Sequence, residues 1–395
     1  MLLKNDLLLP DVIDPRVYKE AKSLVKNGYE VFVVCRNSME NKPKIEDFEG
    51  IKVYRIPQKS IKIPFIKSIL GPMYKKVKTI IEIKKLNPDI IHVHELNILQ
   101  IGIISKFIIK KPVIYDAHED YQKLMLEGIQ KLNSEDSTIF RKNSTKAKYY
   151  YFYLTRVISE PLYLQFVDHV ITVNTILLDK YKKYANTSII YNCREQSTNI
   201  EYVDRSEFGL KETDFVIIFV GKSYKNLGLE MMLEAFNYLD ETVKCIFVGG
   251  GLEFDKIKNK TNESPFKSQI IFTGVVSRDK VMSLIRMSSA GIVIFPPYHN
   301  NLIGSPNKFF EYMLGGIPVI ASDFPIMRKI IHDNHCGIPI NPESVEELVN
   351  AINFLKNNPE ERKLMGENGR RAAIEKYNWE CQETELLNIY KEILK

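Results

Sequence analysis

Short runs of valine and isoleucine alternate with helix-like segments along almost the whole chain, and this alternation restricts the fold more than any other feature. Such runs include EVFVVC (30–35) and DIIHVH (89–94) in the first half, and DFVIIFVGK (214–222) and AGIVIFPP (290–297) in the second. Strands buried on both faces of a sheet have continuous apolar sequences, and strands that alternate with helices form parallel sheets. The sequence therefore predicts an α/β protein with doubly wound parallel sheets.

The length of 395 residues predicts two domains, because a single hydrophobic core stops growing at about 250–300 residues. The polar, unpatterned stretch CREQSTNIEYVDRS (193–206) separates the two halves, so we expect an N-terminal domain over 1–195 and a C-terminal domain over 206–378. The two domains would face each other across a cleft that binds the ligand. The first strand must come from MLLKNDLLLP (1–10), and its polar interruption predicts a short or incomplete strand.

The composition excludes several classes of protein. The apolar runs are shorter than the roughly 18 residues that span a membrane, and the N-terminus has no signal-peptide pattern. The five cysteines form no Cys-x-x-Cys pair, which favours a reduced cytosol over a disulfide or zinc framework. A net charge of +6 does not require nucleic acid but suits anionic ligands or lipid headgroups.

The segment SPNKFFEYMLGGIPVIASD (305–323) predicts a helix whose start binds an anion. Ser305 is a good N-cap residue, and Pro306 would then occupy the first helical position. The free N–H groups of Asn307, Lys308 and Phe309 and the positive end of the helix dipole would attract a phosphate. The lysine side chain adds a full positive charge. The pair Gly315–Gly316 would end the helix.

Two interpretations of Glu311 remain open from this pattern. Lys308 and Glu311 are three residues apart, so they could form an ordinary exposed pair. Alternatively, Glu311 lies about 6 Å along the helix axis from its start, which suits a ribose behind a bound diphosphate. The second interpretation is favoured because the other helix positions are mostly apolar: Phe309, Phe310, Tyr312, Met313 and Leu314.

The same segment resembles the nucleotide-sugar signature of the family-4 retaining glycosyltransferases (glycosyl transferases group 1), which have the GT-B fold. Further segments are similar to that family in the expected order. These are VIDPRVYKEAKSLVKNGYEVFVV, PDIIHVHELN, PVIYDAHED, FVGKSYKNLGLEMMLEAF, IIFTGVVSRDKVMSLIRMSSAGIVIFPP and KYNWE. The resemblance covers nearly the full length. It implies two Rossmann-like domains, with the nucleotide sugar bound by the second, and a last helix over 379–395 that crosses back to the first.

The resemblance also implies roles for individual residues. Glu311 would bind the ribose hydroxyls, His118 would face the transferred sugar or the acceptor, and Lys222 would neutralise the leaving diphosphate. Further donor-binding positions would be Gly274, Val275, Gly304, Ser305, Asn307, Lys308 and Lys225. Retention would proceed by attack on the face that the nucleotide leaves. Positioning and charge stabilisation would then supply the catalysis, without a metal or other cofactor.

Two positions depart from the family pattern. Many members have a second carboxylate eight residues before Glu311, where this chain has Ile303. A basic residue often precedes the glycine of GLE, where this chain has Leu227; Lys225 could substitute for it, or Lys222 could act alone. The contacts with the donor sugar and the phosphates are therefore less constrained than the ribose contact.

Other histidines and a glycine run have competing interpretations. His92 and His94 alternate along a strand and face the same way, as a metal pair would, but no further ligand spacing supports a metal. His118 in DAHED is adjacent to carboxylates and could serve as a base or a hydrogen-bonding group. His332 and His335 are expected to be structural or solvated. The run FVGGGL lacks the G-x-G-x-x-G spacing of dehydrogenases.

The basic stretch KSIKIPFIKSILGPMYKKVKTIIEIKK (59–85) is either an amphipathic helix with a solvated lysine face or a contact with anionic lipid. The lysines that would meet the lipid are Lys62, Lys67, Lys75, Lys76 and Lys78. The second interpretation suits a lipid-linked acceptor at the inner face of the plasma membrane. Many relatives use such acceptors in envelope polysaccharide assembly.

The function predicted from the sequence is a cytoplasmic glycosyltransferase that moves a sugar from a nucleotide donor to a glycan or lipid-linked acceptor. Two alternatives remain: a non-catalytic nucleotide-sugar-binding subunit, suggested by Ile303 and Leu227, and a nucleotide-sugar epimerase. The pattern specifies neither the base, the sugar, the acceptor nor the linkage, because a few pocket contacts determine them.

Overall fold

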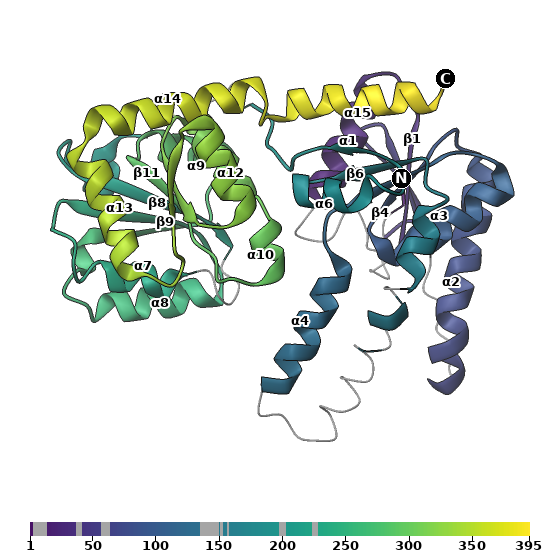
Figure 1. The fold of residues 1–395 in the computed structure, drawn as a ribbon, viewed down its shortest axis with the longest axis horizontal. Helices are drawn as coiled ribbons and strands as arrows, with labels where there is room; N and C mark the ends of the chain where they lie inside the picture. Colours follow the sequence, from purple (N-terminus) through teal and green to yellow (C-terminus); the bar gives the residue numbers. More distant parts are fainter. Residues whose placement is uncertain are drawn as a thin grey trace. The chain divides into compact units, whose positions relative to one another are not determined.

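The computed structural model describes residues 1–2, 14–36, 42–56, 64–134, 150, 153–155, 158–196, 203–222 and 228–395. The chain divides into two compact units. The first contains Met1–Tyr191 together with Glu383–Lys395, and the second contains Asn192–Gln382. Each unit has its own sheet with helices packed around it (Figure 1).

The sheet of the first unit is mainly parallel. Its strands are β1 (Val31–Arg36), β2 (Ile45–Phe48), β3 (Ile51–Ile56), β4 (Ile91–His94), β5 (Val113–Ala117), β6 (His169–Thr172) and β7 (Asn186–Ile189). They form the runs β1-β3-β2 and β4-β5-β6-β7, and only the β2–β3 pair is antiparallel. Leu2 bridges Val34 of β1 and Val93 of β4 in parallel, which joins the two runs. The rest of the predicted first strand lies outside the described residues.

The helices of the first unit are α1 (Pro15–Lys26), α2 (Pro64–Leu86), α3 (Leu96–Ile109), α4 (Tyr121–Ser134) and α6 (Thr175–Tyr181). The Asp14 side chain caps α1 by accepting hydrogen bonds from the N–H groups of Arg16 and Val17. The helix ends at Lys26, with Asn27 as its C-cap.

The sheet of the second unit is entirely parallel. Its strands are β8 (Phe215–Lys222), β9 (Val243–Gly250), β10 (Ile270–Gly274), β11 (Ala290–Val293), β12 (Val319–Ser322) and β13 (Gly337–Ile340). Their order is β10-β9-β8-β11-β12-β13, which is that of a Rossmann-type doubly wound sheet. The winding direction reverses between β8 and β11. Ligands of such sheets bind at this switch point, beyond the carboxyl ends of the strands.

Helices cover both faces of the second sheet (Figure 1). They are α7 (Leu229–Ala235), α8 (Leu252–Asn262), α9 (Arg278–Arg286), α10 (His299–Ile303), α11 (Asn307–Gly315), α12 (Pro325–Asn334), α13 (Val345–Asn357) and α14 (Pro359–Glu375). The last helix, α15 (Trp379–Ile393), begins in the second unit and ends in the first. None of the helices in the described ranges has the length and apolarity needed to span a membrane.

Candidate functional site

Helix α11 is held against the switch point of the second sheet by Tyr312. The tyrosine ring occupies the space above Gly291 of β11, where an added Cβ would lie 2.2 Å from the ring. Its hydroxyl accepts a hydrogen bond of 2.9 Å from the N–H of Val220 in β8. Glycine is therefore required at position 291, and α11 is fixed to both strands that flank the switch point.

The start of α11 differs from the sequence prediction by one residue. The helix begins at Asn307 with Pro306 as its N-cap, so the prediction of Ser305 as the cap was wrong. The reason is that Pro306 has an extended backbone (ψ 149°) and already accepts the N–H of Phe309 at 2.9 Å. The N–H groups of Asn307 and Lys308 still lack partners within the helix. The predicted end is confirmed, with Gly316 in the left-handed conformation.

The Lys308 ammonium group lies on aromatic rings beside the end of β8. Its Nζ atom is 3.7 Å from the centre of the Phe219 ring and 5.2 Å from that of Phe295. Burial lowers the pKa of Lys308 to about 7, although attraction to Glu311 opposes this shift. An added Cβ at Gly221 would lie 3.3 Å from Nζ, so the ammonium lies close to the β8 backbone.

Glu311 is buried, with 5% of its surface exposed. Its Oε1 atom lies 3.1 Å from Nε of Arg194, near the start of the second unit. The interpretation of Glu311 as an exposed partner of Lys308 was therefore wrong. The sequence analysis missed Arg194, because no spacing rule relates it to α11.

The remaining predicted donor-binding residues follow the carboxyl ends of neighbouring strands. Lys222 is the last residue of β8 and is aligned with Gly250 at the end of β9. Gly274 ends β10 in the left-handed conformation (φ 71°), and Val275 follows it with 80% of its surface exposed. Gly304 and Ser305 lie between α10 and α11. Ile303 is buried, and Lys225 lies outside the described residues.

A second group of charged side chains lies at the carboxyl ends of β4 and β5 in the first unit. Both oxygens of Asp116 accept hydrogen bonds of 2.9 Å from the Arg16 guanidinium. The Oδ2 atom also lies 2.7 Å from Nε2 of His118 and 3.1 Å from Nδ1 of His94. Burial by itself would raise the pKa of Asp116, but attraction to Arg16 and His118 brings it well below its usual value. This shift favours the ionised form of Asp116.

The contact with Asp116 determines which nitrogen of His118 accepts a hydrogen bond. An ionised carboxylate only accepts hydrogen bonds, so the Nε2 atom of His118 must carry a proton. In the neutral ring the Nδ1 atom then carries the lone pair. The His118 side chain is 23% exposed, whereas Asp116 is fully buried. His118 is thus the member of this group that can present a hydrogen-bond acceptor to a ligand.

Four buried residues of the first unit are of the types that bind metals: Glu20, His92, His94 and Asp116. Their ligand atoms all lie within 4.8 Å of one another. However, Arg16 already contacts both carboxylates, with Nε 3.1 Å from Glu20 Oε1 and 2.9 Å from Asp116 Oδ2. A metal ion would have to compete with this guanidinium. The group fits an internal ion pair better than a metal site, and the absence of a metal stays a prediction.

Protonation also balances the charge in this group. Burial, together with the charge of Asp116, raises the pKa of Glu20 well above its usual value. Burial likewise lowers the pKa of both His92 and His94. The raised pKa of Glu20 and the lowered pKa values of His92 and His94 all favour the neutral forms of these groups, beside the charged pair of Arg16 and Asp116.

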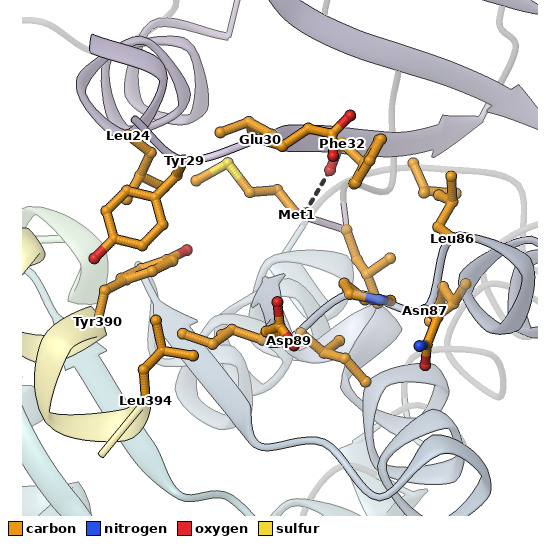
Figure 2. Close-up of a pocket in the computed structure, with 17 residues that line it drawn as sticks. Met1, Leu24, Tyr29, Glu30, Phe32, Leu86, Asn87, Asp89, Tyr390 and Leu394 are labelled. Atoms are coloured by element: carbon orange, nitrogen blue, oxygen red, sulfur yellow. Dashed lines mark hydrogen bonds between the residues drawn. The ribbon is translucent and has the colours of Figure 1, made fainter. Parts of the chain in front are cut away.

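A separate cavity of about 240 Å³ lies in the first unit (Figure 2). Its lining includes Tyr29 and Phe32 at the start of β1, Asp89 before β4, and Tyr390 and Leu394 from the end of the chain. It therefore opens at the amino ends of the strands, opposite the edge where doubly wound sheets bind ligands. None of the predicted site residues lines it.

Comparisons with known proteins agree with this architecture. Residues 16–194 match the family model described as Glycosyltransferase Family 4, and residues 202–372 match the model described as Glycosyl transferases group 1. An uncharacterized glycosyltransferase of Methanocaldococcus jannaschii is 24% identical over 390 residues, which cover 94% of this chain and 92% of that protein.

Two solved structures have a similar fold. Sucrose-phosphate synthase from Thermosynechococcus elongatus has a TM-score of 0.69 at 18% identity, covering 96% of this chain and 92% of that one. Anabaena HepE in complex with UDP has a TM-score of 0.70 at 16% identity and covers 99% of both chains. The predicted α/β class and GT-B fold are confirmed.

Proposed function

The chain belongs to the family 4 (group 1) glycosyltransferases, and on this basis we propose that it transfers a sugar with retention of anomeric configuration. The donor is a nucleotide sugar, and the acceptor is a glycan or a lipid-linked glycan. We assign it to envelope polysaccharide synthesis in the cytoplasm. The observation that supports this most is the placement of a buried carboxylate and a buried ammonium, Glu311 and Lys308, on the helix at the switch point.

On the donor side, the start of α11 would bind the diphosphate of the nucleotide, and the next helical turn would bind its ribose. The first N–H groups of the helix and the Lys308 ammonium attract the diphosphate. One turn further, Glu311 accepts hydrogen bonds from the vicinal ribose hydroxyls. As the bond to the sugar breaks, negative charge builds up on the leaving phosphate oxygens. Lys308, Lys222 and the helix dipole stabilise that charge without a metal or other cofactor.

On the acceptor side, His118 would orient a hydroxyl group. Its Nδ1 lone pair can accept a hydrogen bond from the transferred sugar or from the acceptor, while Asp116 fixes the ring through Nε2. Retention follows when the acceptor oxygen attacks the face from which the diphosphate departs. The proton of the acceptor hydroxyl then passes to the leaving phosphate oxygen, so the step balances without a covalent enzyme intermediate.

Two assays test this function. The first is a thermal-shift screen with UDP, GDP, ADP, CMP and their sugars. Nucleotides with one of these bases should raise the midpoint of unfolding, because ligand binding stabilises the folded state. HepE was crystallised with UDP, so uridine nucleotides are the first probes. Glu311→Gln should weaken binding of that nucleotide at least about tenfold, since hydrogen bonds to charged groups contribute about 1.5–3 kcal/mol. Glu360→Gln, on the exposed face of α14, is the matched control.

Product analysis separates the alternatives. Sugar transfer or slow donor hydrolysis, with the anomeric configuration of the product kept by NMR, supports a retaining transferase. Nucleotide binding with no turnover of any donor would favour the non-catalytic subunit. An altered sugar released from the donor alone would favour the epimerase. If no nucleotide shifts the unfolding midpoint, the assignment of Glu311 fails.

We further propose that α2 contacts an anionic membrane surface that holds the acceptor. Met73, Val77 and Ile81 are spaced by four residues and are 62%, 46% and 41% exposed, so one face of this helix has an apolar stripe in solvent. Exposed lysines accompany it: Lys76, Lys78, Lys84 and Lys85. Co-flotation with vesicles containing anionic lipid, but not with neutral vesicles, is expected. Replacing Val77 and Ile81 by Ser should abolish it, and binding equal to wild type would contradict this surface.

A further inference from the structure

Arg194 presents an unused hydrogen-bond donor beside Glu311. Its Nε atom lies 3.1 Å from the Glu311 carboxylate, and its side chain is 28% exposed. Its Nη1 atom is buried and has no hydrogen-bond partner in the described part of the chain. A buried donor without a partner costs about 1–3 kcal/mol, so a ligand that supplies an acceptor there gains stability.

Ribose hydroxyls match this pair of side chains chemically. Each hydroxyl donates one hydrogen bond and still accepts others through its oxygen lone pairs. An ionised glutamate can only accept, whereas a guanidinium can only donate. We propose that Arg194 is a donor-binding residue that binds the ribose of the nucleotide together with Glu311. The glutamate accepts from the hydroxyls, and the Nη1 group of Arg194 donates to a hydroxyl oxygen.

The position along α11 favours the ribose over the diphosphate as the partner of Arg194. The expected diphosphate site is at the start of the helix, at Asn307 and Lys308, about 6 Å along the axis from Glu311. Arg194 contacts Glu311 at 3.1 Å, so its Nη1 donor lies beside the position assigned to the ribose. This inference rests on the proposed function, because it requires a nucleotide at Glu311.

The backbone around Arg194 is held in place before any ligand binds. Its carbonyl oxygen accepts a hydrogen bond of 3.0 Å from the N–H of Trp379. Two residues later, the N–H of Gln196 donates to Glu380 at 3.1 Å. A side chain on a fixed backbone loses less freedom on binding, so its hydrogen bonds contribute more of their energy to affinity.

The test is calorimetric titration with ribose and 2′-deoxyribose forms of one nucleoside diphosphate. UDP, GDP and ADP are titrated first, and the tightest binder is then compared with its 2′-deoxy form. The variants are Arg194→Gln, Arg194→Lys and Glu311→Gln. Arg371→Gln is the matched control, since Arg371 is an exposed arginine on α14 that donates a hydrogen bond to Asn368 of the same helix. Unfolding midpoints without ligand verify that each variant is folded.

We expect Arg194→Gln to weaken binding of the ribonucleotide about tenfold and binding of the 2′-deoxy form much less, because the lost contact is to a hydroxyl. Arg194→Lys keeps the charge but not the fork geometry, so it should restore part of the affinity. Arg371→Gln should bind both forms as the wild type does.

Other outcomes overturn the inference. Equal or tighter binding by Arg194→Gln would mean that the arginine only neutralises or blocks Glu311. An equal loss for the ribose and 2′-deoxyribose forms would mean a general charge or folding effect rather than a contact with a hydroxyl. If Glu311→Gln weakens binding and Arg194→Gln does not, this inference fails while the proposed function stands. If the wild-type protein binds none of the diphosphates, both fail.

Discussion

The two units bury charged side chains at equivalent places, the carboxyl edge of a doubly wound sheet, but they balance the charge differently. In the first unit, Arg16 neutralises Asp116 through two hydrogen bonds of 2.9 Å. In the second unit, the Lys308 ammonium lies on aromatic rings, and no salt bridge reaches it from the residues that the structure describes. The first arrangement is complete within the protein, whereas the second becomes favourable when an anion arrives. This difference separates a group that orients a histidine from the group that we propose binds a ligand.

The largest expected effect comes from breaking the buried ion pair of Arg16 and Asp116. Asp116→Asn removes the carboxylate that accepts two hydrogen bonds from the buried Arg16 guanidinium and leaves only Glu20 beside it, which should lower the free energy of unfolding by about 3–5 kcal/mol. Urea denaturation measures this loss. Asp323→Asn is the control, because its partner Arg328 is half-exposed and such surface pairs contribute about 1 kcal/mol or less. Similar losses in the two variants would contradict the assignment of Asp116 as the buried anchor.

A smaller effect is expected on nucleotide affinity when pH changes, because no salt bridge in the described part of the chain reaches the Lys308 ammonium before the ligand binds. The pKa of Lys308 is lowered to about 7 by burial, so the free protein loses this proton as pH rises above 7. A bound diphosphate favours the charged ammonium, so binding above pH 7 takes up a proton. Affinity for the nucleotide should therefore fall between pH 7 and 9, by at most about tenfold per pH unit.

Titration in buffers of different ionisation enthalpy measures this proton uptake directly. Lys308→Arg keeps its charge throughout the range, so it should bind with little pH dependence. A wild-type affinity that is constant from pH 7 to 9 would show that the ammonium is not neutralised by burial. The free energy of unfolding of the ligand-free protein should increase as pH rises above 7. The reason is that Lys308 loses its proton in the folded protein but keeps it in the unfolded chain.

The smallest expected effect concerns Glu20, where the sign is opposite to that for Lys308. Burial raises the pKa of Glu20 well above its usual value, so the folded protein keeps a proton that the unfolded chain releases. The free energy of unfolding should thus decrease as pH rises from the usual glutamate range toward the folded pKa. Glu20→Gln removes this decrease, and the two proteins should differ by about 1 kcal/mol per pH unit or less. Parallel stability curves would mean that Glu20 is ionised in the folded protein.

The sequence predicted most of the fold because its strands are local patterns. Runs such as DFVIIFVGK became β8, and the Gly315–Gly316 pair ended α11 as expected. Strand β13 was not predicted, because GIPI is short and Pro339 in it is unusual away from sheet edges. Strand β2 was missed as well, since IEDF (45–48) has few apolar residues. The start of α11 shifted by one residue because Ser and Pro are both common near helix starts.

Site residues were predictable where they lie in a sequence motif. They were unpredictable where they meet their partner only in the folded structure. Glu311, Lys308 and His118 belong to recognisable segments. Arg194 lies in none of these segments, and Arg16 lies in one whose pattern does not reveal its partner. Each pairs with a carboxylate more than 90 residues away in the sequence, Asp116 for Arg16 and Glu311 for Arg194. No periodicity rule extends over such separations, so these partners follow only from the three-dimensional fold.

The second unit is an insertion within the first. The chain leaves the first unit after Tyr191 and re-enters it at Glu383. The returning segment brings Tyr390, whose hydroxyl lies 2.9 Å from Nδ1 of His92. Residues 192–382 can therefore be excised as one continuous piece, whereas the first unit needs both ends of the sequence. A stop codon after residue 382 would leave the second unit whole and would damage the unit that begins the chain.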